Sequence, residues 1–286
     1  MTKAIFPVAG FGTRFLPATK AQPKEMLPVV DKPVIQYLVE DAARAGIKDV
    51  IFVTGRGKRA IEDHFDYSFE LDKTLVEKNK LDLVKTVRRV AELARFSYVR
   101  QSMPLGDGHA IACASHLVND EPTLIVFGDT LYDAVVSPTE QVIAAYNKYQ
   151  APIIGLAQVA RSEVSKFGVI DGEIMDEGVY KIKSFVEKPT AEDAPSDLVA
   201  VGIYIITPQV LEVLSKMVNG KSGEIRLADA FDMMLAAGET LYGIELDGEW
   251  LDTGSKLGLL QANITLGLKN EEVGSDLKKF LNNLKY

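Results

Sequence analysis

This sequence of 286 residues lacks the features of disulfide-bonded and membrane-spanning proteins. Its single cysteine, Cys113, excludes a disulfide within the chain. No apolar run approaches the roughly 18 to 20 residues that a transmembrane helix needs. The first residues contain no long, signal-like apolar stretch. We therefore expect a cytoplasmic protein without a membrane partner, with Cys113 packed as a small core residue of a helix over residues 110–117.

Positive charge is also scarce. The chain has 32 basic and 40 acidic residues, a net charge of −8, and a pI near 5.1. Nucleic-acid binding needs a basic face and a high pI, so we expect no nucleic-acid partner. The first 32 residues are an exception, because five basic and two acidic residues give them +3 and leave −11 for the remainder. A basic segment on an acidic protein indicates a small anionic ligand.

Strand-like and helix-like segments alternate along the chain, which predicts an α/β protein. We expect strands at residues 4–8, 49–54, 96–100, 123–127, 152–159, 179–186 and 198–206. Helices are expected from Pro33 to about Ala45, within the charged region 58–95, and in the tail 255–286. No linker, repeat or low-complexity tract interrupts the chain, so we expect one domain over residues 1–286.

The most informative segment is residues 8–28, which follows the first expected strand. Gly10 and Gly12 lack a Cβ, so their backbone can approach a ligand closely and present N–H groups to phosphate. Arg14 and Lys24 add positive charge. This combination suits a nucleoside triphosphate.

Two other glycine-rich motifs do not fit this segment. A dinucleotide-binding fingerprint needs a third glycine where this chain has Phe15, and Pro17 arrives too early for a continuous helix. The Walker pattern, with Gly-Lys-Ser or Gly-Lys-Thr, is absent as well. Taken alone, Gly-x-Gly could still be a tight turn flanked by surface cations.

The whole of residues 8–28 resembles the signature of the sugar-1-phosphate nucleotidyltransferases. Residues 17–37, 64–66 and 68–71 resemble the uridylyl-transferring branch. The resemblance is weakest near residues 72–95, 130–150 and 270–286. It implies a Rossmann-like, mixed and mostly parallel central sheet flanked by helices, the nucleotidyltransferase (GT-A-like) fold. It also implies a nucleotide-binding half to about residue 135, a sugar-binding half over about 136–254, and a helical C-terminal region over about 255–286.

The resemblance assigns nucleotide-binding roles to the first loop. The backbone at Ala9 and Gly10 would meet the base, and Gly12, Thr13 and Arg14 would hold the triphosphate. Lys24 matches the family lysine that contacts phosphates near the reacting centre. A lysine is a compact, mobile charge suited to that task.

A second segment resembles the part of the family that reads the base. Gln101 supplies a donor and an acceptor, which suits a uracil or thymine edge. Gly106 and Gly108 would allow the base to approach the backbone. This chain has Asp107 where the uridylyl branch usually carries an apolar residue. His109 is expected to support this loop rather than to transfer protons.

The resemblance implies a magnesium site at two aspartates. Asp129 follows the expected strand 123–127, and Asp252 lies in Trp-Leu-Asp-Thr-Gly. Mg²⁺ prefers carboxylate and phosphate oxygens. Either aspartate could instead cap a helix or a turn, and Asp133 competes with Asp129 for the metal role.

Sugar-binding roles follow from the same resemblance. Glu187 could accept hydrogen bonds from sugar hydroxyls, and Lys188 could meet the sugar phosphate. Gly168, Val201 and Gly202 match the walls of the sugar pocket, with the glycines leaving room for a hexose. Glu224 and Asp229 match another family segment but could equally stabilise the helix that follows.

We therefore expect Mg²⁺-assisted transfer of a uridylyl group from UTP to glucose 1-phosphate, giving UDP-glucose and pyrophosphate. Residues 128–130 and 250–254 resemble the thymidylyl-transferring branch, so a dTTP-dependent enzyme is the alternative. A regulatory paralogue without catalysis and a nicotinamide-dependent oxidoreductase are further alternatives. The family resemblance also implies a homodimer or homotetramer, with residues 66–95 and the C-terminal helices available for subunit contacts or for covering the sheet.

Overall fold

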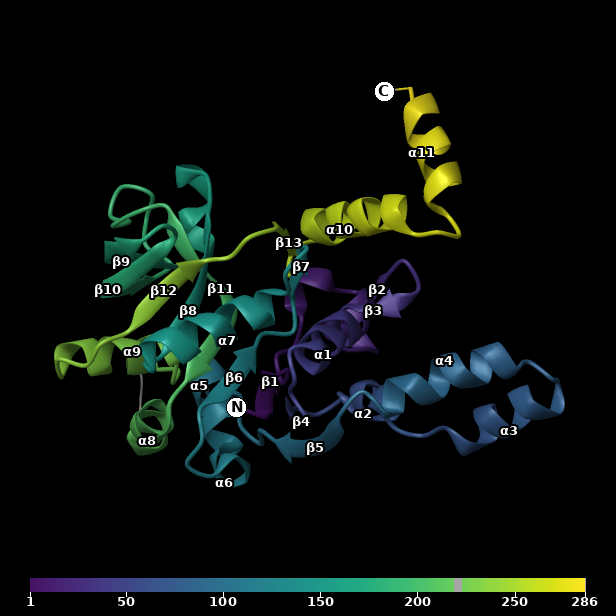
Figure 1. The fold of residues 1–286 in the computed structure, drawn as a ribbon, viewed down its shortest axis with the longest axis horizontal. Helices are drawn as coiled ribbons and strands as arrows, with labels where there is room; N and C mark the ends of the chain where they lie inside the picture. Colours follow the sequence, from purple (N-terminus) through teal and green to yellow (C-terminus); the bar gives the residue numbers. More distant parts are fainter. Residues whose placement is uncertain (219–222, 286) are drawn as a thin grey trace.

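The computed structural model describes residues 1–218 and 223–285, and a nine-stranded sheet lies at its centre (Figure 1). The strand order is β5-β4-β1-β6-β11-β8-β12-β10-β9. These strands are β1 (Lys3–Pro7), β4 (Asp49–Thr54), β5 (Arg95–Arg100), β6 (Thr123–Val126), β8 (Ile153–Gln158), β9 (Gly168–Asp176), β10 (Val179–Glu187), β11 (Leu198–Ile206) and β12 (Tyr242–Glu245). Two small sheets pair β2 (Pro28–Val29) with β3 (Lys32–Pro33) and β7 (Thr130–Asp133) with β13 (Glu249–Asp252).

Helices cover both faces of the central sheet. They are α1 (Val34–Arg44), α2 (Arg59–Phe65), α3 (Phe69–Glu77), α4 (Leu81–Ala91), α5 (Asp107–Cys113), α6 (Ser115–Val118), α7 (Pro138–Tyr149), α8 (Pro208–Lys216), α9 (Leu227–Ala236), α10 (Lys256–Lys269) and α11 (Gly274–Asn283). None of the helices in the described part of the chain is long and apolar enough to cross a membrane.

The alternation of side chains along β1 shows how the two layers of core are built. Ala4 and Phe6 belong to the hydrophobic cluster that contains buried residues of α1 and α7. Ile5 belongs to a second cluster, with buried residues of α5, α8 and α9. Successive side chains of a strand point to opposite faces, so one short strand contributes to both layers. The apolar faces of the helices therefore lie against a sheet whose central strands are buried on both sides, whereas β5 and the second half of β9 are largely exposed.

The sheet is mixed, as the resemblance implied, but it is not mostly parallel. Among the neighbouring strands in the order above, β5–β4, β4–β1, β1–β6 and β8–β12 are parallel. The other four neighbouring pairs are antiparallel. The parallel strands β1, β4 and β5 are joined through helices, whereas β9 and β10 form a hairpin, and a tight turn gives only antiparallel pairing.

Several expected elements match the structure closely. β4 and β11 have the expected bounds, and α1 begins one residue after Pro33. Region 58–95 divides into α2, α3 and α4, and the expected helical tail becomes α10 and α11, with Tyr286 outside the described residues. The sequence reading did not identify β7, β9, β12 and β13 or helices α7, α8 and α9.

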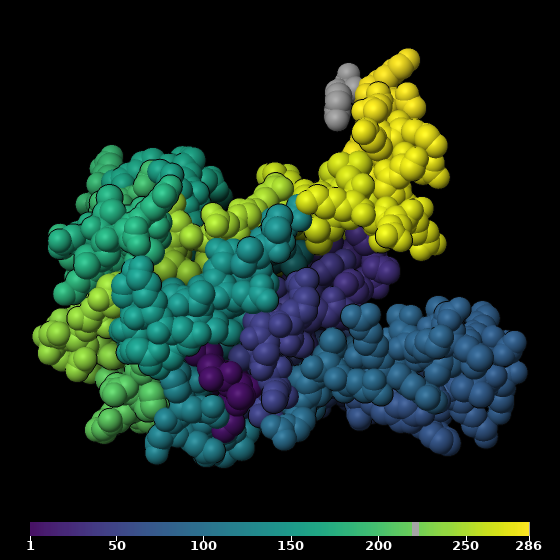
Figure 2. Space-filling model, in the orientation of Figure 1, coloured from purple at the N-terminus to yellow at the C-terminus, as the bar shows by residue number. Residues whose placement is uncertain are grey.

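Two helical regions extend away from the sheet. Figure 1 shows α3 and α4 as an antiparallel arm beyond β5, and α10 and α11 leading away from β13. Figure 2 shows that the arm stands clear of the body on the face in view. Ion pairing joins the two helices of the arm, because Arg88 donates two hydrogen bonds to the carboxylate of Asp72 at 2.6 and 2.8 Å. The arm is therefore a helical hairpin whose two helices are joined by an ion pair, rather than an irregular loop.

The small β7–β13 sheet brings together distant parts of the chain. Asp252 pairs in register with Thr130, and Trp250 pairs with Tyr132. Thr253 adds two hydrogen bonds to the carbonyl oxygen of Asp129, at 3.1 Å from its N–H and 2.8 Å from its hydroxyl. These contacts place Asp252 beside the residue that follows β6.

Candidate active site

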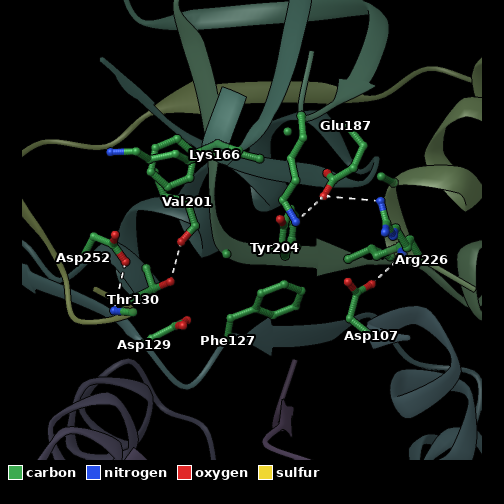
Figure 3. Close-up of a pocket in the computed structure, with 18 of the residues that line it drawn as sticks. Asp107, Phe127, Asp129, Thr130, Lys166, Glu187, Val201, Tyr204, Arg226 and Asp252 are labelled. Atoms are coloured by element: carbon green, nitrogen blue, oxygen red, sulfur yellow. Dashed lines mark hydrogen bonds and ion pairs between the residues drawn. The ribbon is translucent and has the colours of Figure 1, made fainter. Parts of the chain in front are cut away.

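A cavity of about 350 Å³ opens where the first loop, the β7–β13 sheet and β9–β11 meet. It lies near the carboxyl ends of β1 and β6, where ligands bind in open α/β sheets. In Figure 3, Asp129 and Asp252 lie at one end of the cavity, while Asp107, Glu187 and Arg226 lie at the other. The expected site residues around it are Gly12, Thr13, Arg14, Lys24, Asp129, Gly168, Glu187, Lys188, Val201, Gly202 and Asp252.

The first loop is folded so that its cations face this cavity. Gly12 has φ of 65°, a left-handed conformation that glycine adopts without strain. A Cβ there would lie 3.1 Å from the Cβ of Lys24, so the loop closes tightly on the lysine. Thr19 donates to the Gly12 carbonyl at 2.7 Å. Arg14 donates to the Gly254 carbonyl at 3.4 Å, across the cavity mouth.

Lys24 and Asp129 form an ion pair with 2.5 Å between Nζ and Oδ2. Burial by itself lowers the pKa of Lys24, but the Asp129 and Glu25 carboxylates outweigh burial and raise that pKa above its usual value. Burial raises the pKa of Asp129, but Lys24 and Arg14 outweigh it and the net shift is downward. Both groups are therefore charged at neutral pH.

Asp252 faces the same ion pair. A Cβ built on Gly254 would lie 2.8 Å from Asp129 Oδ2 and 2.9 Å from Asp252 Oδ1, so the two carboxylates converge on one point. Burial raises the pKa of Asp252, and the Asp129 carboxylate adds to this shift, although the Gly254 N–H opposes it at 3.0 Å. Two converging carboxylates are a donor set that fits Mg²⁺.

The other end of the cavity is built from β10 and the start of α9. Glu187 Oε1 lies 3.4 Å from Lys188 Nζ and 3.8 Å from Arg226 Nη1, so one carboxylate faces two cations. Lys188 has φ of 49° and donates its N–H to the Phe167 carbonyl at 2.9 Å. Such an ion cluster can accept hydrogen bonds from hydroxyls and also meet a phosphate.

The glycines of this wall serve the protein's own packing. A Cβ at Gly168 would lie 2.5 Å from the Phe185 ring and 3.0 Å from Glu187 Oε2. Gly202 has φ of 87°, and a Cβ there would lie 2.6 Å from Thr130 Oγ1. The interpretation that these glycines leave room for a hexose is therefore incomplete, because protein side chains already occupy the space that a Cβ would need.

Four expected nucleotide-binding residues, Ala9, Gly10, Gln101 and Gly106, do not line this cavity. Ala9 and Gly10 lie in the loop after β1, and Gln101 follows β5. These loops are neighbours of the loop after β4, because a Cβ at Gly55 would lie 2.9 Å from Ala9 O and the Gln101 N–H donates to Thr54 O at 2.9 Å. Gly10 is exposed, with open space around it.

The base-reading segment is internally bonded. Gln101 Nε2 donates to Gly106 O at 2.8 Å and lies 3.0 Å from His109 Nδ1, which agrees with a supporting role for His109. A Cβ at Gly106 would lie 2.3 Å from Ile225 O. The glycine at 106 is thus required by contact with the segment before α9, whereas the sequence interpretation attributed it to the approach of a base.

The sequence reading missed several residues that line the cavity. Arg226 lies inside a segment that the resemblance matched to the family, in which only Glu224 and Asp229 were predicted as candidates. Asp107 accepts a hydrogen bond from the Leu227 N–H at 2.7 Å, and burial raises the pKa of Asp107 to about 6. Ten other lining residues lie inside segments that the resemblance matched to the family, although no individual role was predicted for them: Phe15, Thr130, Phe167, Phe185, Ala200, Tyr204, Leu227, Ala228, Trp250 and Gly254. Phe127, Lys166 and Phe231 lie outside those segments and were not predicted.

The competing candidates lie outside the cavity lining. Asp133 forms an ion pair with Lys269, so Asp129 is the aspartate that faces the cavity. Glu224 is about half exposed and pairs with Arg226 at 3.0 Å. Asp229 lies in the first turn of α9.

Cys113 ends α5 and is only partly buried against the core, and the expected helix over 110–117 is divided between α5 and α6.

Comparison with known proteins agrees with this geometry. The chain is 44% identical over 283 residues to UTP–glucose-1-phosphate uridylyltransferase 2 of Staphylococcus saprophyticus, covering 99% of this chain and 98% of that protein. A crystal structure of UDP-glucose pyrophosphorylase complexed with UDP-glucose has 43% identity and a TM-score of 0.86, over 94% of this chain and all of that one.

A UTP-bound UDP-glucose pyrophosphorylase from Acinetobacter baumannii has 37% identity and a TM-score of 0.92, and each chain is covered completely. The family model described as nucleotidyl transferase matches residues 3–267. That match spans the cationic loop after β1, both converging aspartates and the Glu187–Lys188 wall. The chain therefore belongs to the nucleotidyl transferase family.

Proposed function

We propose that this protein transfers the uridylyl group of UTP to α-D-glucose 1-phosphate, giving UDP-glucose and pyrophosphate. The observation that carries the proposal is that one cavity joins a cationic loop and two converging carboxylates to an ion cluster suited to a sugar phosphate. The nucleotide and the sugar phosphate would thus meet between the two ends. The names of the relatives and the ligands of the matching structures support UTP and glucose 1-phosphate as the substrates.

The reaction needs positioning and charge neutralisation more than proton transfer. A phosphate oxygen of glucose 1-phosphate forms a bond to the α-phosphorus of UTP, and the bond from that phosphorus to the oxygen of pyrophosphate breaks in line. The attacking oxygen is already anionic, so no general base is required. Arg14 and Lys24 would stabilise the triphosphate, and Glu187 and Lys188 would hold the sugar phosphate in reach.

Magnesium is the proposed cofactor, and the residues present fit it. The charged groups around the cavity are five cations and four carboxylates, so they are nearly balanced before a polyanionic substrate arrives; they are Arg14, Lys24, Lys166, Lys188, Arg226, Asp107, Asp129, Glu187 and Asp252. A bound Mg²⁺ would supply the missing positive charge to the reacting phosphates. Asp129 and Asp252 would hold it, with water and phosphate oxygens as the other ligands.

The proposed nucleotide is tested by measuring pyrophosphate release with glucose 1-phosphate and Mg²⁺, comparing UTP with dTTP over a range of concentrations. We expect kcat/KM to favour UTP by about 10-fold or more, the discrimination that a small group in a fitted pocket gives. A preference for dTTP would assign the protein to the thymidylyl branch. Binding of both substrates without turnover, for other sugar phosphates too, would support a regulatory paralogue instead.

Lys24→Ala is expected to lower kcat at least about 10²-fold, because it removes a charged group aimed at the transferred phosphates. Lys20→Ala is the matched control, since Lys20 is exposed in the same loop and does not line the cavity. Its kcat should stay within about 2-fold of the wild-type value. Near-normal turnover of Lys24→Ala would remove this lysine from the mechanism.

Asp252→Asn is expected to raise the Mg²⁺ concentration for half-maximal activity by about 10-fold or more, because one of the two carboxylate ligands is lost. Asp133→Asn is the control: Asp133 lies at the other end of β7 and pairs with Lys269. Titrating activity with MgCl₂ at saturating UTP gives the comparison. An unchanged metal dependence of Asp252→Asn would reject the proposed ligand.

We further propose that the enzyme is a cytoplasmic homodimer or homotetramer. Large apolar side chains are exposed on the arm and on the C-terminal helices, among them Phe69, Leu81, Leu257, Leu260 and Phe280, which are 52–67% exposed. Patches of this kind mark association surfaces. Sedimentation velocity should show two or four times the 31.3 kDa chain mass, and cell fractionation should recover it with cytoplasmic markers. A monomer at micromolar concentration would contradict the assembly.

A further inference from the structure

A buried ion pair lies behind the phosphate-binding end of the cavity without lining it. Lys58 Nζ is 2.8 Å from Glu25 Oε2, and the two side chains are 6% and 1% exposed. Lys24 and Asp129, which line the cavity, are about a quarter exposed. Desolvating two charges is costly, and a well-packed apolar pair of the same volume is often at least as stable. Stability alone therefore does not explain an ion pair at this depth.

Glu25 lies directly against the backbone that carries both partners of the cavity ion pair. It follows Lys24 in the short helix η3 (Lys24–Met26). It also packs over Gly128, the residue before Asp129, because a Cβ built on Gly128 would lie 2.6 Å from Glu25 Cγ. The position of the Glu25 side chain therefore determines how the backbones of Lys24 and Asp129 meet.

Lys58 is held by its backbone at the start of α2 and by the loop that precedes it. It ends the loop that follows β4, immediately before α2, and its carbonyl accepts a hydrogen bond from the Ile61 N–H at 3.0 Å. Gly55, at the other end of the loop, approaches Ala9 so closely that a Cβ would lie 2.9 Å from Ala9 O. The Lys58 ammonium thus extends to Glu25 from a rigid support.

The four charged groups alternate in sign, from Lys58 through Glu25 and Lys24 to Asp129. Burial raises the pKa of Glu25, and Lys58 and then Lys24 oppose that shift. Glu25 in turn helps Asp129 to keep the Lys24 ammonium charged. Removing Lys58 would leave Glu25 as a buried carboxyl without its nearest cation, next to the lysine that faces the phosphates.

We propose that Glu25 and Lys58 are a positioning pair: Lys58 fixes Glu25, and Glu25 fixes the Lys24–Asp129 contact in the geometry that uridylyl transfer requires. The inference rests on the proposed function for the reaction it serves. Both side chains are almost fully buried and neither lines the cavity, so we expect them to act through Lys24 and Asp129 rather than by touching the substrates. Loss of the pair should therefore lower kcat while the KM for UTP changes little.

The experiment is a double-mutant cycle on the full chain, with Lys24→Ala, Lys58→Met and their combination. Lys58→Met alone should lower kcat by about 10- to 100-fold, as misplacement of a catalytic group does, with the KM for UTP within about 3-fold. In the Lys24→Ala background the same substitution should lower kcat by no more than about 2-fold, because the group being positioned is already absent.

Arg88→Met is the matched control, because it removes a cation from Asp72, a mostly buried carboxylate of the arm. Its kcat should stay within about 2-fold of the wild-type value. Glu25→Gln, which keeps the size of the side chain, repeats the cycle in case Lys58→Met does not fold, as judged by circular dichroism. Equal loss of kcat in both backgrounds, or an unchanged kcat in a folded variant, would overturn the proposal.

The nucleotide preference of the wild-type protein distinguishes failure of this inference from failure of the proposed function. If wild-type protein uses dTTP in preference to UTP, the uridylyl assignment fails, and the cycle is run with dTTP. Coupling between Lys24 and Lys58 in that cycle would still support the positioning pair, and additivity would still overturn it.

Discussion

The ion pair between Lys24 and Asp129 is the contact on which the rest of the site depends. It joins the loop after β1 to the short segment after β6, and these two strands are parallel neighbours in the sheet. Each group would be costly to hold without the other in a partly desolvated cavity, so the two segments are constrained to approach. The tight turn at Gly12 and the packing of Glu25 over Gly128 both serve this approach.

The second constraint is topological. Asp252 reaches the site because β13 pairs with β7 in a register that puts it opposite Thr130, and Thr130 donates to the Val201 carbonyl at 2.5 Å. One threonine thus connects the end of the cavity that holds Asp129 and Asp252 to the β11 wall. A shift of the β7–β13 register by one residue would turn the Asp252 side chain to the other face and separate the two carboxylates.

Local signals in the sequence were enough to predict the α/β class, the bounds of β4 and β11, and the cationic loop, because periodicity and glycine spacing are read within a few residues. They were not enough for β7 and β13, which are four residues each and are defined by pairing with each other across the chain. The same limit explains why roles for Arg226 and Lys58 were not predicted. An exposed and a buried lysine or arginine look alike in sequence, and only the fold shows which carboxylate each one meets.

Pairing of charges also explains how this cavity can exist before its substrates bind. Lys24 faces Asp129, Lys188 faces Glu187, and Lys166 pairs with Glu163, so much of the positive charge is already balanced. Arg14 makes its one described side-chain hydrogen bond to a carbonyl rather than to a carboxylate, so its charge remains available to an anion that enters the cavity. A polyanionic nucleotide entering so balanced a site gains little from the protein's net charge. Under the proposed function, binding would come from exchange of partners: the lysines would turn to phosphate, and the carboxylates that they release would become available to the proposed Mg²⁺. Such an exchange would make the geometry behind Lys24 as important as the charge on it.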